Sequence, residues 1–210
     1  MRFGKKTCNR NEILSIKWSY GAGNYSIDGI DLRKSPYYGL YPSVNSLDFL
    51  PYYSMVDDPV IKEMAEQLED QFDEYTDERR RSSIILAMIQ ENIAYASDEE
   101  RFGRDLWEPP VLTLLKGEAD CDGMALLYTS VAYNLGLDVI TVVVEGHMCA
   151  AVNVFANGTF YEFEGKKYYH VESTADLPAV GRYWDSARLI CMARPATPTS
   201  EFRRTLLHTV

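Results

Sequence analysis

Cysteine is scarce in this sequence, and long apolar runs are missing. Its four cysteines are scattered along the chain, at Cys8, Cys121, Cys149 and Cys191. They lack the close pairing of a disulfide framework, which favours reduced thiols. No apolar run approaches the roughly 20 residues of a membrane-spanning helix, and the basic N-terminus is not followed by the apolar stretch of a secretory signal. We therefore expect a soluble, cytoplasmic protein without a membrane partner.

Positive charge is also in the minority. The chain has 21 Lys and Arg against 31 Asp and Glu, which gives a formal net charge of −10 at pH 7. Nucleic-acid binding needs clustered basic side chains. The one dense basic run, Arg79-Arg80-Arg81, follows the acids Asp77 and Glu78 and is typical of a solvated helix face. We expect no nucleic-acid partner, and the charge leaves the substrate open.

The 210 residues are 46% hydrophobic, enough for a globular domain with a substantial core. The first 56 residues are rich in Tyr, Gly, Ser and Pro, and predict an extension of short strands and turns, with 13–20 as its best strand. Residues 57–194 are predicted to form the main domain. Residues 195–210 are predicted to be a loose C-terminal tail.

Within 57–194 the hydrophobic pattern changes from helical to strand-like, which predicts an α+β fold. A helix is expected after Asp58-Pro59, another over 76–95 and a buried one from Cys121 to Gly136, with a loop over 96–110. Four strand-like segments follow: 137–145, 147–155, 159–164 and 167–172. With Asn157-Gly158 as a hairpin signal, they predict an antiparallel meander packed on the third helix.

Three residues at the joints of these elements suggest nucleophilic catalysis. Cys121 lies where a loop enters the buried helix, where free N–H groups favour a thiolate. A thiol nucleophile needs a base, and the base needs an acid that orients it. His147 opens a strand and Glu172 ends another, so the two can supply those roles if the strands are adjacent.

The order of these residues resembles the transglutaminase-like superfamily. The resemblance rests on Gly117-Glu118-Ala119-Asp120-Cys121-Asp122, then Gly146-His147, then Val171-Glu172-Ser173-Thr174, and covers roughly residues 60 to 185. It implies a papain-like core with the helix of Cys121 packed on the sheet. It also implies a cysteine hydrolase or acyltransferase that acts on a peptide or Gln side-chain amide through a thioester. Glu172 stands where that family more often has Asp.

The resemblance implies a triad in which Cys121 is the nucleophile, His147 the base and Glu172 the orienting acid, without a cofactor. The N–H of Cys121 is one expected oxyanion donor. The sequence leaves the second donor open among Trp107, Tyr95 and Gln90.

Other histidine and cysteine residues have simpler interpretations. Cys149 shares a strand face with His147 and is a further pocket candidate. His170 shares a face with Glu172, but the pattern gives the base to His147, so His170 is predicted to be structural.

Two alternatives to an enzyme remain. A chain that keeps this fold without activity would be a peptide-binding module, which the acids beside Cys121 favour. A zinc protein could use Cys121, His147, Cys149 and either Glu172 or His170 as ligands, although short-spaced cysteine pairs are missing. Oligomeric state and substrate identity are not encoded in any recognisable pattern.

Overall fold

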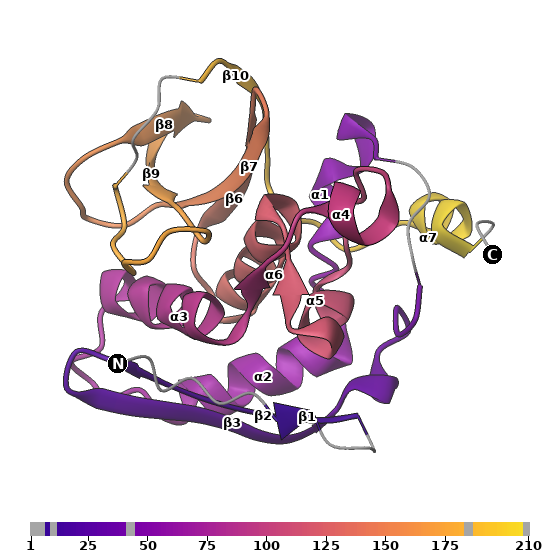
Figure 1. Cartoon of the computed structure of the whole chain (residues 1–210). Coiled ribbons are helices and arrows are strands. Elements are labelled where there is room, and N and C mark those ends of the chain that lie inside the picture. The colour runs from indigo at the N-terminus through magenta and orange to yellow at the C-terminus, as the bar shows by residue number, and fades with distance from the viewer. Residues whose placement is uncertain (1–6, 9–11, 41–44, 183–186, 208–210) are drawn as a thin grey trace.

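The computed structural model describes residues 7–8, 12–40, 45–182 and 187–207. Figure 1 shows a β-hairpin at the bottom, helices α2 (Pro59–Glu69) and α3 (Glu78–Asn92) above it, helix α6 (Cys121–Asn134) in the middle, and a curled antiparallel sheet beyond α6. The predicted α+β class is therefore confirmed. No helix in the described ranges is long and apolar enough to cross a membrane.

The helices begin where polar side chains can cap them. Asp58 accepts a hydrogen bond from the Val60 N–H at 2.8 Å and starts α2, and Asp77 accepts one from Arg80 N–H at 2.7 Å and starts α3. α3 ends at Asn92, before the predicted boundary, because the chain becomes extended. Residues Ala94–Tyr95 instead form strand β4, which pairs in parallel with β5 (Glu118–Ala119).

Helix α6 is buried almost all round, as its apolar circumference predicts. It contacts α2, α3 and α5 (Pro110–Lys116) on one side and the curled sheet on the other. Asp120 caps it by accepting the N–H of Asp122 at 3.1 Å. Gly123 permits close packing, because a Cβ at this position would lie 2.8 Å from the Ala119 Cβ.

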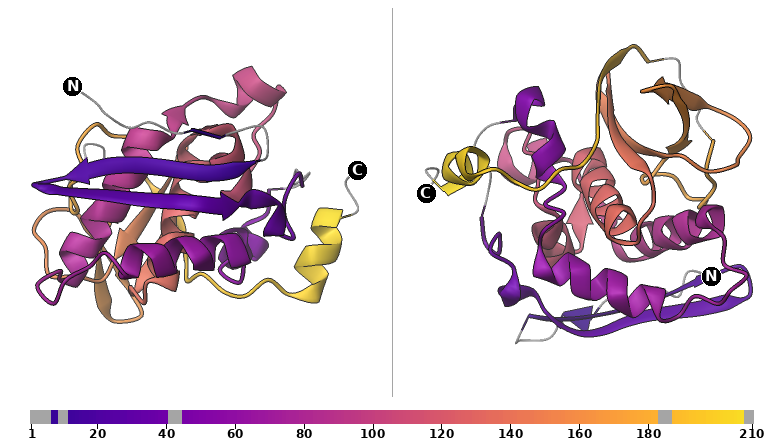
Figure 2. Two further views of the ribbon diagram at one scale, coloured as in Figure 1. Left: turned by 90° about the horizontal axis from the view of Figure 1, so that it is seen from below. Right: turned by 180° about the vertical axis from the view of Figure 1, so that it is seen from behind.

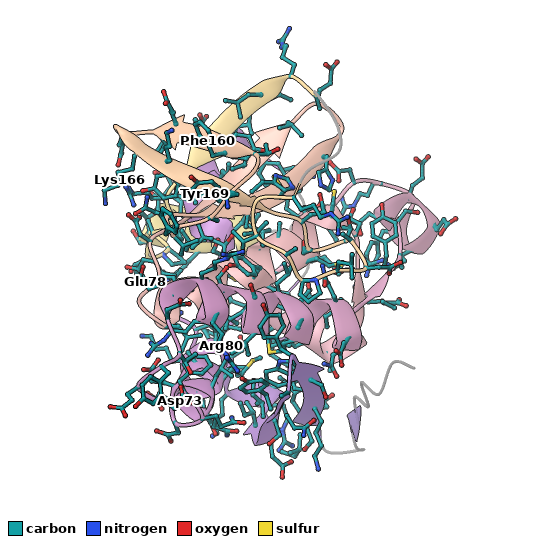
Figure 3. The ribbon with its side chains drawn as sticks, turned by 90° about the vertical axis from the view of Figure 1, so that its left-hand side faces the viewer. Asp73, Glu78, Arg80, Phe160, Lys166 and Tyr169 are labelled. Carbon is teal, nitrogen blue, oxygen red and sulfur yellow. The ribbon has the colours of Figure 1, made fainter. Side chains whose placement is uncertain are left out.

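The curled sheet has five strands in the order β10-β6-β7-β9-β8. Their bounds are β6 Val139–Val144, β7 His147–Val152, β8 Phe160–Phe163, β9 Lys166–Val171 and β10 Leu189–Ala193. The predicted meander is wrong, because β9 rather than β8 pairs with β7. The hairpin of β8 and β9 folds back at Glu164 and Gly165, which both have positive φ, and β9 is its inner strand, next to β7. Figure 3 shows Phe160 and Tyr169 together on this hairpin, above the start of α3 at Glu78; their ring centroids are 5.9 Å apart.

The N-terminal segment shares the main core. Strands β2 (Ile13–Tyr20) and β3 (Gly23–Asp31) form a hairpin, with β1 (Thr7–Cys8) at its edge, and the hairpin lies across α2 and α3 (Figure 2). Trp18 is buried there and donates its indole N–H to the Ile84 carbonyl at 3.0 Å. The apolar residues of β2 and β3 thus belong to the same hydrophobic cluster as those of α6.

Two further segments are more ordered than the sequence predicted. The expected loop 96–110 contains α4 (Asp98–Phe102), because Arg101 and buried acids pair within it. The expected loose tail contains α7 (Ser200–Leu207), which packs through the buried Phe202 against α1 (Leu50–Tyr53). Short 3-10 turns at Leu32–Lys34 and Leu47–Phe49 complete the described elements.

Candidate active site

The structure brings together the three residues that the sequence singled out. Cys121 is the first residue of α6, at its N-terminal tip. His147 is the first residue of β7 and follows Gly146, whose φ of 76° allows the chain to turn sharply out of β6. Glu172 directly follows the last residue of β9.

His147 donates its Nε2 hydrogen to Glu172 Oε2 across 2.8 Å. The register of the sheet explains the contact. Ala150 of β7 pairs with Val171 of β9, and continuing that register by one residue places Glu172 opposite Cys149 and diagonal to His147. Diagonal neighbours on antiparallel strands are within reach of long side chains, so the longer glutamate suits this position.

The carboxylate of Glu172 is held at both oxygens. Oε1 accepts the backbone N–H of Thr174 at 3.0 Å and the Thr174 hydroxyl at 2.7 Å, while Oε2 accepts from His147. Burial alone would raise the pKa of Glu172, but hydrogen bonds from His147, His170 and Thr174 outweigh it and hold this pKa far below its ordinary range. Glu172 is therefore ionised at neutral pH.

Cys121 lies close enough to His147 to be one of the groups that raise the pKa of its imidazole. Because Nε2 faces Glu172, Nδ1 is the ring nitrogen left for the sulfur. Burial disfavours the imidazolium, yet the hydrogen bonds to Cys121 and Glu172 prevail and raise the pKa of His147 from 6.5 to about 10. The site can thus keep a proton on His147, between a sulfur and a carboxylate, across the neutral pH range.

Cys121 and His147 line an open cavity of about 420 Å³. Tyr95 and Trp107 form aromatic walls, both of them oxyanion or pocket candidates from the sequence. The parallel pairing of β4 with β5 fixes Tyr95 beside the residues that lead into α6. Tyr95 is 61% exposed at the rim, whereas Trp107 is largely buried.

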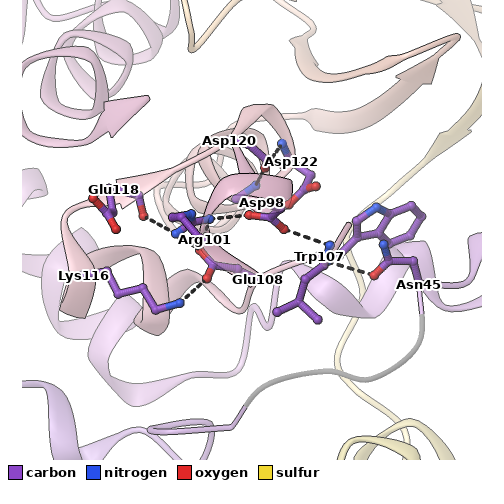
Figure 4. A network of polar contacts seen from close by, with 11 residues as sticks. Asn45, Asp98, Arg101, Trp107, Glu108, Lys116, Glu118, Asp120 and Asp122 are labelled. Carbon is purple, nitrogen blue, oxygen red and sulfur yellow. Dashed lines mark hydrogen bonds and ion pairs between the residues drawn. The ribbon is translucent and has the colours of Figure 1, made fainter. Parts of the chain in front are cut away.

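A buried ionic network supports the segment that carries Trp107 (Figure 4). Arg101 pairs with Asp98 and, at 3.2 Å, with Glu108, and Lys116 reaches the other oxygen of Glu108 at 2.6 Å. The backbone N–H of Trp107 donates to Asn45 at 2.9 Å. The charged residues that suggested a loop therefore fold inward and position a wall of the cavity.

The other two candidates lie away from this cavity among the described residues. Gln90 donates its side-chain N–H groups to the carbonyls of Glu172 at 2.9 Å and Leu177 at 3.4 Å, so it fixes the backbone behind the site. Cys149 is fully buried, with its sulfur 3.6 Å from His170 Nδ1 and 3.7 Å from the Tyr161 hydroxyl. Burial also raises the pKa of Cys149 to about 12.

Sequence reasoning did not foresee the acidic wall of the cavity. Asp105, Asp120 and Asp122 line it, and their carboxylate oxygens, together with that of Asp98, lie within 4.8 Å of one another. Burial, then the neighbouring Asp120, raises the pKa of Asp122 well above its ordinary value. The sequence carried a signal for Asp120 and Asp122, since both flank Cys121, whereas Asp105 lies in the predicted loop, after α4.

The zinc-ligand set proposed from the sequence is not gathered in the same way. Among the described residues, the four aspartates above form a group in which the potential ligand atoms all lie within 4.8 Å of one another. Cys121, His147, Cys149 and Glu172 do not form such a group. The geometry of the cysteine and histidine residues therefore does not favour the zinc alternative.

Comparison with known proteins adds little. No family model matches the sequence, and no curated protein does. One similar solved structure is the crystal structure of a "putative protease" from Parabacteroides distasonis ATCC 8503, with a TM-score of 0.40 and 11% sequence identity. The match covers 81% of this chain and 40% of that one, so this chain spans less than half of its length. A likeness at this level does not establish a shared fold.

Proposed function

We propose that the chain is a cysteine hydrolase or acyltransferase of transglutaminase-like type, which acts on a peptide or Gln side-chain amide. The observation that carries the proposal is the meeting of Cys121 and His147 at the wall of an open cavity, with His147 bonded to Glu172 at 2.8 Å and with Cys121 close enough to His147 to help raise its pKa. A nucleophile, a base and an orienting acid in hydrogen-bond reach of one another are the requirements for thiol catalysis.

The first half-reaction forms a thioester. The Cys121 sulfur attacks the amide carbonyl carbon, and the C=O π electrons move to the oxygen as the C–S bond forms. When the C=O bond re-forms, the C–N bond breaks, and Nδ1 of His147 gives its proton to the leaving nitrogen. Glu172 keeps Nε2 protonated throughout, so that Nδ1 is the nitrogen that exchanges protons.

The second half-reaction releases the acyl group. Water or an amine attacks the thioester carbonyl and gives a proton to Nδ1 of His147, and the sulfur leaves as a thiolate. The backbone N–H of Cys121 is available at the helix tip for the oxyanion. Of the second donors that the sequence left open, Tyr95 and Trp107 line the cavity, which favours them over Gln90.

Site-resolved alkylation tests the proposal. The purified chain is treated with limiting iodoacetamide, and the modification of each cysteine is followed by peptide mass spectrometry. Cys191 is a matched internal control, because it is partly buried like Cys121. We expect Cys121 to react faster than Cys8, Cys149 and Cys191, and His147→Ala to abolish that preference. Equal rates at Cys121 and Cys191 in the unaltered chain would contradict the proposal and favour an inactive peptide-binding module.

A further inference from the structure

His170 is a buried titratable residue that the proposed mechanism does not use. It lies on β9 and is 0% exposed. Its Nε2 is 3.5 Å from Glu172 Oε2, the same oxygen that accepts the His147 hydrogen. On its other side, Nδ1 is 3.0 Å from the Tyr161 hydroxyl on β8. A buried imidazole therefore connects Tyr161 to the carboxylate that orients His147.

The partners of His170 determine where its hydrogen lies. A carboxylate can only accept, so the Glu172 oxygen 3.5 Å away favours the tautomer of His170 with its hydrogen on Nε2. In the neutral ring Nδ1 is then the acceptor, and the Tyr161 hydroxyl supplies the matching donor.

The backbone around His170 leaves this contact little freedom. The His170 N–H donates to the Thr159 carbonyl at 3.0 Å, and the Gly181 N–H donates to the His170 carbonyl at 2.7 Å. Gln90 holds the Glu172 carbonyl from α3 at 2.9 Å. The backbone at His170 and Glu172 is thus fixed by three separate parts of the chain.

The Glu172 side chain borders a space away from His147. It does not line the cavity of Cys121 and His147 but a separate one, of about 170 Å³, together with Asp176 and Arg182. A carboxylate released from His170 could turn toward that cavity and the Arg182 guanidinium, away from His147. We propose that His170, held in place by Tyr161, is a positioning residue that keeps the Glu172 carboxylate oriented toward His147. The positioning of Glu172 by His170 does not depend on the proposed function; only its importance for catalysis rests on that function.

The charged and titratable groups around Glu172 come from every neighbouring element. They are Cys121 on α6, His147 and Cys149 on β7, Tyr161 on β8, His170 on β9, and Asp176 and Arg182 on the loop after β9. Of these, His147 reports most directly on Glu172, because their hydrogen bond contributes to the raised pKa of His147.

The test is a titration of His147 by NMR in chains labelled at histidine. The sequence has three histidines, so the spectra are sparse and can be assigned by substitution. In the unaltered chain we expect His147 to titrate near pH 10. In His170→Leu and in Tyr161→Phe we expect its pKa to fall by at least about one pH unit, a tenfold change in proton affinity. His170→Gln, whose amide can replace Nε2–H as donor, should restore most of the difference.

A matched control separates positioning from loss of structure. Tyr168 is a buried tyrosine of the same sheet, and its hydroxyl donates to Asp138 at 2.9 Å rather than contacting His170. Tyr168→Phe should leave the pKa of His147 unchanged. Should His170→Leu fail to fold, Tyr161→Phe carries the test. An unchanged titration of His147 in Tyr161→Phe and His170→Leu would overturn the inference.

The two proposals fail separately. The titration needs no substrate and no reactive thiol. A shifted His147 pKa in His170→Leu, together with indiscriminate cysteine alkylation, would retain the positioning role and overturn the proposed function. Selective alkylation of Cys121 with an unshifted His147 would do the reverse.

Discussion

The hydrogen bond between His147 and Glu172 should make the stability of the fold depend on pH in a defined window. The pKa of His147 is raised from 6.5 to about 10 in the folded chain, where hydrogen bonds to Cys121 and Glu172 overcome the opposing effect of burial. A group with a raised pKa binds its proton more tightly when folded. Its contribution to stability is therefore fully present below pH 6.5 and is lost as pH rises through about 10.

The magnitude follows from the same values. A difference of about 3.5 pH units corresponds to an upper limit of about 5 kcal/mol. The His147 side chain is 23% exposed, and solvent screens its interactions, so we expect about 2 kcal/mol to be lost across the window. Glu172→Gln keeps the shape of the side chain but removes its charge, and should lose much of this dependence.

The assay is urea unfolding of both chains at several pH values between 6.5 and 10, followed by circular dichroism. Subtracting the two unfolding free energies at each pH removes the contributions of other titrating groups. We expect the advantage of the unaltered chain over Glu172→Gln to shrink as pH rises. A constant gap across the window would refute the reasoning.

Two further substitutions test the structures that support the cavity. Arg101→Met leaves the buried acids Asp98 and Glu108 without their shared cation and should lower the free energy of unfolding by about 3–5 kcal/mol. As a control in the same denaturation experiment, Arg33→Met, at an exposed pair with Asp31, should lower it by less than about 1 kcal/mol. Phe202→Ala should lower the free energy of unfolding by about 3–5 kcal/mol, because the ring is 1% exposed. It should also change the fluorescence of Trp107, because Tyr53 packs edge-on against both the Phe202 and the Trp107 rings, each with a centroid distance of 5.1 Å. The 92% exposed Phe155 gives the control, since Phe155→Ala should be close to neutral.

The local parts of the fold were predictable from the sequence. The cap at Asp58, the strand Ile13–Tyr20 and the buried helix that begins at Cys121 all follow from neighbours within a few residues. Such features depend on local hydrogen bonds and on the period of the apolar residues. Their local origin explains why the sequence placed the sulfur at a helix tip correctly.

The order of the strands was not predictable, because a local signal was misleading. Asn157-Gly158 is typical of a hairpin turn, yet it lies between β7 and β8, which do not pair. Gly158 has a φ of 112°, and a Cβ there would lie 2.1 Å from the Gly181 carbonyl oxygen. The glycine therefore serves a close backbone approach, and the hairpin turns at Glu164 and Gly165 instead.

This non-local pairing decides the geometry of the candidate site. Only the insertion of β9 beside β7 brings Glu172 within reach of His147, and no pattern within either strand encodes it. The same holds for Asp105 and Trp107, which reach the cavity through the inward-facing network of Arg101. Residues that were expected in a solvent-exposed loop belong to the site because the buried acids Asp98 and Glu108 both pair with Arg101.

The most direct test of the central claim is the capture of an acyl group on Cys121. The chain is incubated with p-nitrophenyl acetate, and the acetylated positions are identified by mass spectrometry as p-nitrophenol is released. The account predicts rapid acetylation of Cys121 in the unaltered chain and its loss in His147→Ala, while Cys191 reacts slowly in both. Acetylation that is no faster at Cys121 than at Cys191, or that persists without His147, would contradict it.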